Sequence, residues 1–287
     1  MTHYSISGAL KGAPTIPIVL DSPHSGTDYP EDFDYAVNFM DLRQAEDTHV
    51  DKLYSFSEEL GIPRLDAHFP RSYIDLNRSR FEIDEALLDE FWIGETVSTG
   101  KVKLGKGLVW RILDDGQAIY KRKLTVAEIQ HRIDNYWLPY HLALSKMIAR
   151  IHKSHGFVLH INCHSMPSVA DRYSTDQPGL EHPDIVLGDR DGTSADHSIT
   201  ISLARYFREL GYSCWINQPY KGVELVRSYS DPAHGRHSIQ IELNRRLYMD
   251  EESREINAGF EVLQAHLREI LVRLIELVKS RVVQQSK

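Results

Sequence analysis

Short apolar runs alternate along the chain with longer segments in which apolar residues recur every three or four positions. The short runs predict buried strands, and the longer segments predict amphipathic helices. Strands are expected at residues 16–21, 64–69, 72–76, 157–163, 184–187, 213–217 and 237–243. Helices are expected at residues 41–60, 125–154, 198–210 and 253–282. This order predicts an α/β fold: a single domain over residues 1–287, with a mixed, mostly parallel sheet and helices on both faces.

Some of these segments carry clear terminal signals, and one long stretch has no period. Thr125 to Glu128 has the form of a capping box, and Gly156 is suited to end the helix that begins there. Pro139 falls inside that helix and predicts a kink or two shorter helices. Asp41 to Gln44 has the form of another capping box. Residues 80–121 follow neither period, and we expect an excursion or a β-hairpin flap there.

The composition and charge of the chain argue against several classes of binding partner. The net charge of −8 argues against nonspecific binding to nucleic acid, because no basic block offsets it. No stretch approaches the ~18 uninterrupted apolar residues of a membrane span, so we expect no membrane partner. The two cysteines lie far apart in sequence and predict a reducing compartment, which makes the cytoplasm the expected location. Oligomeric state cannot be read from these features.

Histidines stand just after two of the predicted strands, at His24 and His164. In an open α/β sheet, ligands bind beyond the carboxyl ends of the strands. A hydrolytic zinc site often takes two neutral imidazoles and one carboxylate, and leaves a fourth position for water. Asp47 is the candidate for the third ligand, with His49 and Asp51 as rivals. A lone loop histidine is more often an ordinary hydrogen-bonding group than a metal ligand, and no short zinc signature such as His-Glu-x-x-His is present.

Glu242 lies within a predicted strand that is otherwise rich in apolar residues. A carboxylate buried in such a place must find a partner or change its ionisation. One interpretation is an ion pair with Arg245 or Arg78. The other is a general base beside a metal-activated water.

Arg71, Arg78 and Arg227 form a third group of candidates. Planar guanidinium groups bind carboxylates through paired hydrogen bonds, so several of them near a pocket indicate an anionic substrate. Each arginine taken alone could instead form a surface ion pair.

An ordered set of short segments resembles the N-formylglutamate amidohydrolase family. The segments are Ser22 to Gly26, Asp47 to His49, Arg71 to Arg78, Asn162 to Ser165, Leu187 to Gly188 with Gly192, Tyr220 to Gly222 with Arg227, Asp231 to Pro232, and Gln240 to Arg245 with Tyr248. No single piece is specific, but together they run in the family's order from about residue 16 to 275.

The resemblance implies a fold related to the zinc carboxypeptidases and to deacylases of aspartate and succinylglutamate. By that analogy Asn77 and Arg78 hold a substrate carboxylate, and Glu242 is the general acid/base. Those relatives take an acidic ligand from His-x-x-Glu, but here His24 is followed by Ser25, Gly26 and Thr27. The acidic ligand must come from elsewhere, and Asp47 is preferred to His49.

The function implied by the resemblance is metal-dependent hydrolysis of N-formyl-L-glutamate, or of a similar small anionic N-acyl amino acid, to formate and glutamate. Zinc is the expected ion, although imidazole and carboxylate ligands suit several divalent metals. The alternatives are a related zinc deacylase or carboxypeptidase-like peptidase acting on another small amide, and a catalytically silent ligand-binding protein of the same fold.

Overall fold

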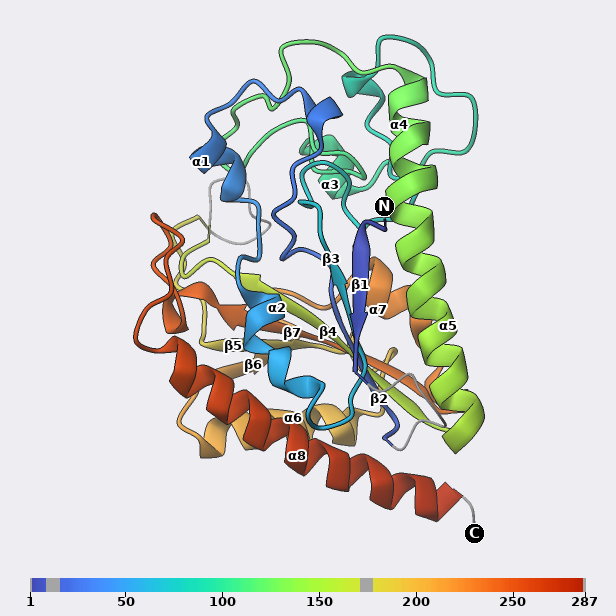
Figure 1. The fold of residues 1–287 in the computed structure, drawn as a ribbon, viewed down its shortest axis with the longest axis vertical. Helices are drawn as coiled ribbons and strands as arrows, with labels where there is room; N and C mark the ends of the chain where they lie inside the picture. The colour runs from blue at the N-terminus through green and yellow to red at the C-terminus, as the bar shows by residue number, and fades with distance from the viewer. Residues whose placement is uncertain (1, 9–15, 171–177, 286–287) are drawn as a thin grey trace.

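The computed structural model describes residues 2–8, 16–170 and 178–285, and its centre is a seven-stranded sheet (Figure 1). The strands are β1 (Tyr4–Ser7), β2 (Ile18–Ser22), β3 (Arg64–Ala67), β4 (Val158–Met166), β5 (Ile185–Gly188), β6 (Cys214–Ile216) and β7 (Arg236–Asn244). They follow the order β1-β3-β2-β4-β7-β5-β6. Neighbouring strands run parallel except in the β1–β3 and β5–β7 pairs. The predicted mixed, mostly parallel sheet is confirmed.

Helices cover both faces of the sheet, as predicted (Figure 1). One face carries α2 (Val50–Leu53), α6 (His197–Glu209) and α8 (Phe260–Gln285). The other carries α4 (Val126–Arg132), α5 (Leu138–His155) and α7 (Glu224–Tyr229). The short helices α1 (Phe39–Arg43) and α3 (Gly100–Lys103) lie beyond one end of the sheet. In the described part of the chain, no helix has the length and apolarity to cross a bilayer.

The local signals around α4 and α5 behave as the sequence predicts. Thr125 caps the backbone N–H of Glu128, whose carboxylate accepts in return from the Thr125 N–H. A π-helical stretch, Ile133–Trp137, joins α4 to α5, and Pro139 is the second residue of α5. The wider turn accommodates a residue that has no N–H to donate. Gly156 ends α5 with a left-handed φ of 67°.

The predicted continuous helix over residues 41–60 is wrong. The chain forms α1 and then a turn, and α2 starts only at Val50, after His49 with a φ of 70°. Asn38, not Asp41, caps α1. The cause is tertiary, because the Asp47 N–H donates to the carbonyl of His24 (3.0 Å), outside any helical ladder. The apolar periodicity of this segment correctly indicates which side chains are buried. The backbone conformation, however, is set by long-range contacts and not by the local helical pattern.

Two other predicted elements differ from the structure, and the stretch without a period can be described. Residues 72–76 form turns and not a strand, because the Asp75 N–H donates to the distant Leu108 carbonyl. The last helix begins at Phe260, and the preceding turn contains Arg254 with a φ of 63°. Residues 80–121, where an excursion or a β-hairpin flap is expected, contain α3 and isolated bridges.

The central strands place polar and ionisable side chains at one edge of the sheet. Because β2, β4 and β7 are parallel neighbours, their carboxyl ends lie together. The register pairs His164 with Glu242, so both side chains emerge on the same side. Ile239 and Ile241 face the core beneath α6 and α8, and Gln240 and Glu242 face the opposite side, as the alternation predicts.

His141 of α5 anchors the turn that carries Asn77. Its Nε2–H donates to the Leu76 carbonyl (2.9 Å), and its ring stacks on Trp137 with centroids 3.6 Å apart. Burial lowers the pKa of His141 to about 4. An imidazole in the unfolded chain has a pKa of about 6.5. Below that pH, His141 therefore binds a proton in the unfolded state but stays neutral in the folded state.

We therefore expect stability to fall as the pH drops from about 6.5 towards 4, with His141 contributing about 2 kcal/mol of the loss by pH 5. Urea unfolding of the wild type and His141→Gln at pH 7.5 and 5 measures this. The free-energy difference between the two proteins should shrink by that amount at the lower pH. His152→Gln, in the same helix but partly exposed, is the control. Equal pH slopes for the wild type and His141→Gln would contradict this account.

Candidate metal centre and active-site cavity

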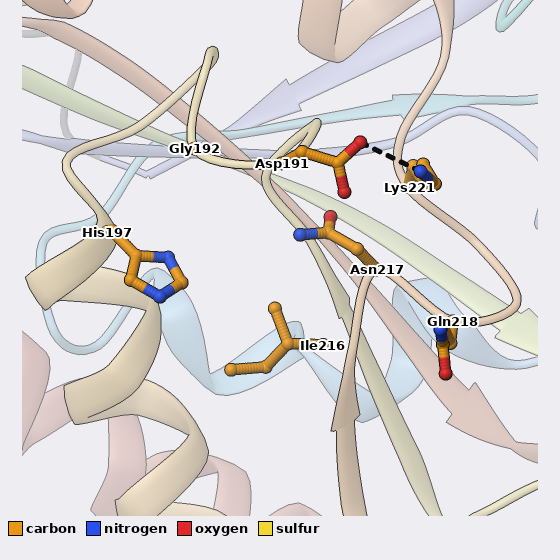
Figure 2. A pocket seen from close by; sticks show the side chains of 7 residues that line it. All are labelled: Asp191, Gly192, His197, Ile216, Asn217, Gln218 and Lys221. Carbon is orange, nitrogen blue, oxygen red and sulfur yellow. Dashed lines mark hydrogen bonds and ion pairs between the residues drawn. The ribbon is translucent and has the colours of Figure 1, made fainter.

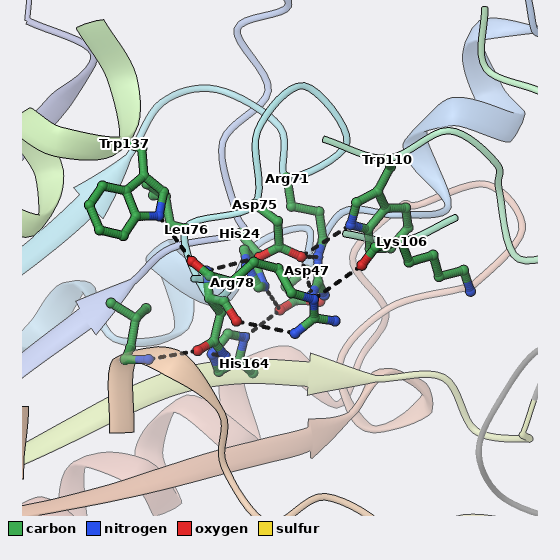
Figure 3. Close-up of polar contacts among 12 residues, drawn as sticks. His24, Asp47, Arg71, Asp75, Leu76, Arg78, Lys106, Trp110, Trp137 and His164 are labelled. Carbon is green, nitrogen blue, oxygen red and sulfur yellow. Dashed lines mark hydrogen bonds and ion pairs between the residues drawn. The ribbon is translucent and has the colours of Figure 1, made fainter. Parts of the chain in front are cut away.

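Three side chains from separate parts of the fold converge at the carboxyl edge of the sheet (Figure 3). His24 follows β2, His164 lies near the end of β4, and Asp47 lies in the turn between α1 and α2. One ligand atom from each lies within 4.8 Å of the others. Asp47 Oδ2 is 3.4 Å from His24 Nδ1 and 3.0 Å from His164 Nδ1. All three residues are buried.

The two rivals of Asp47 lie outside this cluster. His49 turns away, and its Nε2 bonds the Arg254 carbonyl at 2.8 Å. Its Nδ1 lies 3.2 Å from Lys52 Nζ. Asp51, in α2, is not part of the group either.

The His24 ring is oriented by a carboxylate. Its Nε2–H donates to Asp75 Oδ1 (2.8 Å), and Asp75 Oδ2 accepts from Arg71 (2.9 Å) and Trp110 (3.1 Å). Since Nε2 carries the proton, Nδ1 presents a lone pair towards Asp47. This Nδ1 is buried and has no hydrogen-bond partner among the described residues.

The His164 ring is oriented by an amide. Asn162 Nδ2 donates to Asp21 Oδ1 (2.8 Å), which fixes Asn162 Oδ1 towards His164 Nε2 (2.7 Å). An amide oxygen only accepts, so His164 Nε2 must donate and its Nδ1 must present a lone pair. Burial lowers the pKa of His164, which keeps the ring neutral.

Asp47 completes the donor set. Burial alone would raise its pKa, but the adjacent His164 and His24 side chains and the charge of Arg71 hold the pKa of Asp47 well below its usual range. Arg245 also donates to Asp47 Oδ1 (3.0 Å). A nitrogen from each of two imidazole rings and an ionised carboxylate oxygen thus face one another, and His24 Nδ1 has no hydrogen-bond partner among the residues that the structure describes. This set fits a divalent metal ion.

Glu242 lies beside this centre on β7. Gln240 Nε2 donates to its Oε1 (2.8 Å). Neither predicted ion pair forms: Arg245 is engaged by Asp47, and Arg78 bonds backbone carbonyls. Burial first, and then the charge of Asp47, raise the pKa of Glu242 to about 8. Its carboxyl group can therefore gain or lose a proton near neutral pH.

A cavity of about 330 Å³ opens beside the cluster, with His164 and Glu242 in its wall. Asn77 also lines it; its Nδ2 lies 3.2 Å from His164 Nε2, and its Oδ1 accepts from the Leu225 N–H (3.0 Å). The cationic residues in the wall are Arg71, Arg78, Lys101, Lys106, Lys221 and Arg245. This excess of positive charge suits an anionic ligand.

Arg227 is not among the residues that line this cavity, contrary to its predicted role. It lies in the last turn of α7 with its side chain 55% exposed, and its guanidinium pairs with Glu224 at 2.6 Å. The ion-pair alternative therefore holds for Arg227.

Several residues at the site went unassigned in the sequence. Asp75, Asn162 and Asp21 lie in the matched segments or in a predicted strand, but nothing in their spacing identified them as partners of the two histidines. Lys101 and Lys106 lie in the aperiodic stretch of residues 80–121, where no pattern predicted a route to the cavity.

Known proteins match the chain over most of its length. Residues 16–249 match the N-formylglutamate amidohydrolase family. The N-formylglutamate deformylase of Pseudomonas aeruginosa is 29% identical over 273 residues, which cover 93% of this chain and 95% of that protein. The crystal structure of an N-formylglutamate amidohydrolase from Ralstonia eutropha JMP134 is 42% identical, covers 98% of this chain and 99% of that one, and has a TM-score of 0.92. The chain belongs to the N-formylglutamate amidohydrolase family.

Proposed function

We propose that the protein hydrolyses N-formyl-L-glutamate to formate and glutamate with the help of a divalent metal ion. His24, Asp47 and His164 hold this ion, for which zinc is the first candidate. The observation that carries the proposal is the buried donor set with its unpartnered His24 Nδ1, next to a cavity with cationic walls. The activities for which the relatives are named support the choice of substrate.

The chemistry divides between the ion and Glu242. When bound, a divalent ion would polarise the formyl oxygen and lower the pKa of the attacking water towards about 7. Glu242 accepts the proton of the attacking water as the new carbon–oxygen bond forms. It then delivers that proton to the amide nitrogen as the carbon–nitrogen bond breaks. A pKa of about 8 suits both transfers, because an acid/base group works best near the operating pH.

Substrate binding falls to the cationic wall of the cavity. Arg78 and Asn77 bind the carboxylate next to the reacting amide, since Asn77 adjoins His164. Arg71 also lines the cavity, but its charge is largely balanced by Asp75 at 2.9 Å, so it offers hydrogen-bond donors more than free positive charge. A cavity of about 330 Å³ admits a small N-acyl amino acid.

Formate release from a panel of N-formyl, N-acetyl and N-succinyl derivatives of glutamate and aspartate, with acetate and succinate measured in parallel, tests the substrate. We expect N-formylglutamate to have the highest kcat/KM, by about 100-fold over N-acetylglutamate, because the relatives are named for the formyl derivative and a methyl group in place of the formyl hydrogen must find extra room beside the reacting carbon. Dialysis against a chelator should abolish turnover, and added zinc should restore it.

Two results would redirect the proposal. Preference for an acetyl or succinyl group would identify a different deacylase of the same fold. Absence of turnover with every derivative, after loading with zinc, cobalt or manganese, would identify a silent binding protein.

A further inference from the structure

Most of the cations around the cavity already have a carboxylate partner. Arg71 pairs with Asp75 (2.9 Å) and Arg245 pairs with Asp47 (3.0 Å). A carboxylate of the protein therefore balances the charge of each of these two arginines, so their electrostatic attraction for an anionic ligand is reduced.

The two remaining paired cations are lysines. Lys106 is buried, pairs with Asp114, and has its Nζ 5.4 Å from the centroid of the Trp110 ring. Lys221 pairs with Asp191 at 2.8 Å, at the edge of another cavity (Figure 2).

Arg78 and Lys101 differ from the other cations in the wall. Arg78 is 5% exposed, and within the described part of the chain its guanidinium donates to the carbonyls of Lys106 (3.2 Å) and Asn77 (3.1 Å) and to no carboxylate. Lys101 is half-buried in α3, and its ammonium makes no hydrogen bond or ion pair to any residue that the structure describes. The cavity thus keeps two cations without a carboxylate, and N-acyl glutamate carries two carboxylates.

We propose that Lys101 binds the side-chain carboxylate of the substrate, while Arg78 and Asn77 bind its α-carboxylate. This inference rests on the proposed function and deepens it. The α-carboxylate is on the carbon that carries the reacting amide, so it belongs beside Asn77, which contacts His164. The side-chain carboxylate lies two methylene groups farther away and needs a separate cation.

The electrostatic surroundings of Lys101 fit this role. Burial, and then the charge of Arg78, lower the pKa of Lys101 to about 8. An ammonium that is partly dehydrated and repelled by its neighbours gains more from an incoming carboxylate than a hydrated surface lysine does. Residues 80–121 thereby supply the group that selects a dicarboxylate over a monocarboxylate.

The test compares Lys101→Met with Lys103→Met, an exposed lysine of the same helix. Each variant is assayed on N-formylglutamate and on N-formylglutamine, in which a neutral amide replaces the side-chain carboxylate. We expect Lys101→Met to raise KM for N-formylglutamate by about 10- to 100-fold, with kcat nearly unchanged. Its kcat/KM for N-formylglutamine should match that of the wild type. Lys103→Met should behave as wild type on both substrates, and Lys101→Arg should recover part of the selectivity.

Calorimetry of L-glutamate and L-glutamine binding gives a second readout that needs no turnover. Lys101→Met should weaken glutamate binding and leave glutamine binding unchanged. Equal losses on both ligands would assign Lys101 a structural role, and no loss on either would remove it from the site; both results overturn the inference. A wild type that releases no formate but binds glutamate in a Lys101-dependent way would overturn the proposed function alone.

Discussion

His164→Ala is expected to yield a folded protein that has lost its metal and at least about 1000-fold of its turnover. Removing one of three protein ligands leaves too few donors to hold a divalent ion, so its affinity should fall by more than about 100-fold. The loss of several kcal/mol of electrostatic stabilisation then removes most of the rate. His24→Ala and Asp47→Ala should behave alike, because all three residues contribute to one cluster. Elemental analysis of dialysed protein, together with formate release, measures both effects.

His49→Asn is the matched control for this experiment. It removes the rival imidazole two residues from Asp47, and asparagine tolerates the left-handed φ of 70° found there. It should keep its metal and its activity, because His49 bonds the Arg254 carbonyl instead of facing the cluster. Full metal content in Asp47→Ala, with loss in His49→Asn, would reverse the assignment of the third ligand.

Glu242→Gln is expected to lower kcat by about 100- to 10,000-fold while the metal content stays at the wild-type level. Glutamine has the shape of a protonated glutamic acid but cannot accept the proton of water. The substitution should leave the fold intact, because Glu242 has a pKa of about 8 and is largely protonated near neutral pH without metal. Thermal unfolding and metal analysis serve as controls for the rate measurement. Wild-type turnover in this variant would show that another group carries the proton.

The sequence predicted the histidines of the site and Glu242 for a physical reason. A buried strand has a simple signature, and in a parallel sheet the residues at its carboxyl end must meet those of the next strand. His24 and His164 follow from this rule. Glu242 follows from the alternation of β7, which buries Ile239 and Ile241 on one face and turns Glu242 to the other.

Asp47 was predicted as a ligand although its predicted local structure was wrong. The periodicity around it is helical, but the Asp47 N–H bonds His24 and its carboxylate bonds Arg245, two contacts made across 23 or more residues. Such contacts leave no local trace in a sequence. The pairing of His24 with Asp75 and of Asn162 with Asp21 was hidden for the same reason.

Substrate binding was the hardest feature to predict. Reasoning from residue type favoured arginines and placed Arg227 in the site, whereas the structure pairs this half-exposed side chain with Glu224 of the same helix. The position of Lys101 in the cavity wall went unpredicted because residues 80–121 have no period from which the direction of a side chain could be inferred. Whether a cation is free to bind a ligand depends on its carboxylate partners, and those are visible only in three dimensions.

The most direct test of the metal centre is an anomalous diffraction measurement at the zinc absorption edge, on crystals of the zinc-loaded protein. One strong peak is expected, in contact with His24 Nδ1, His164 Nδ1 and a carboxylate oxygen of Asp47. A peak that touches only one of the two rings, or that lies at other residues, would contradict the shared metal site and the hydrolytic mechanism that depends on it.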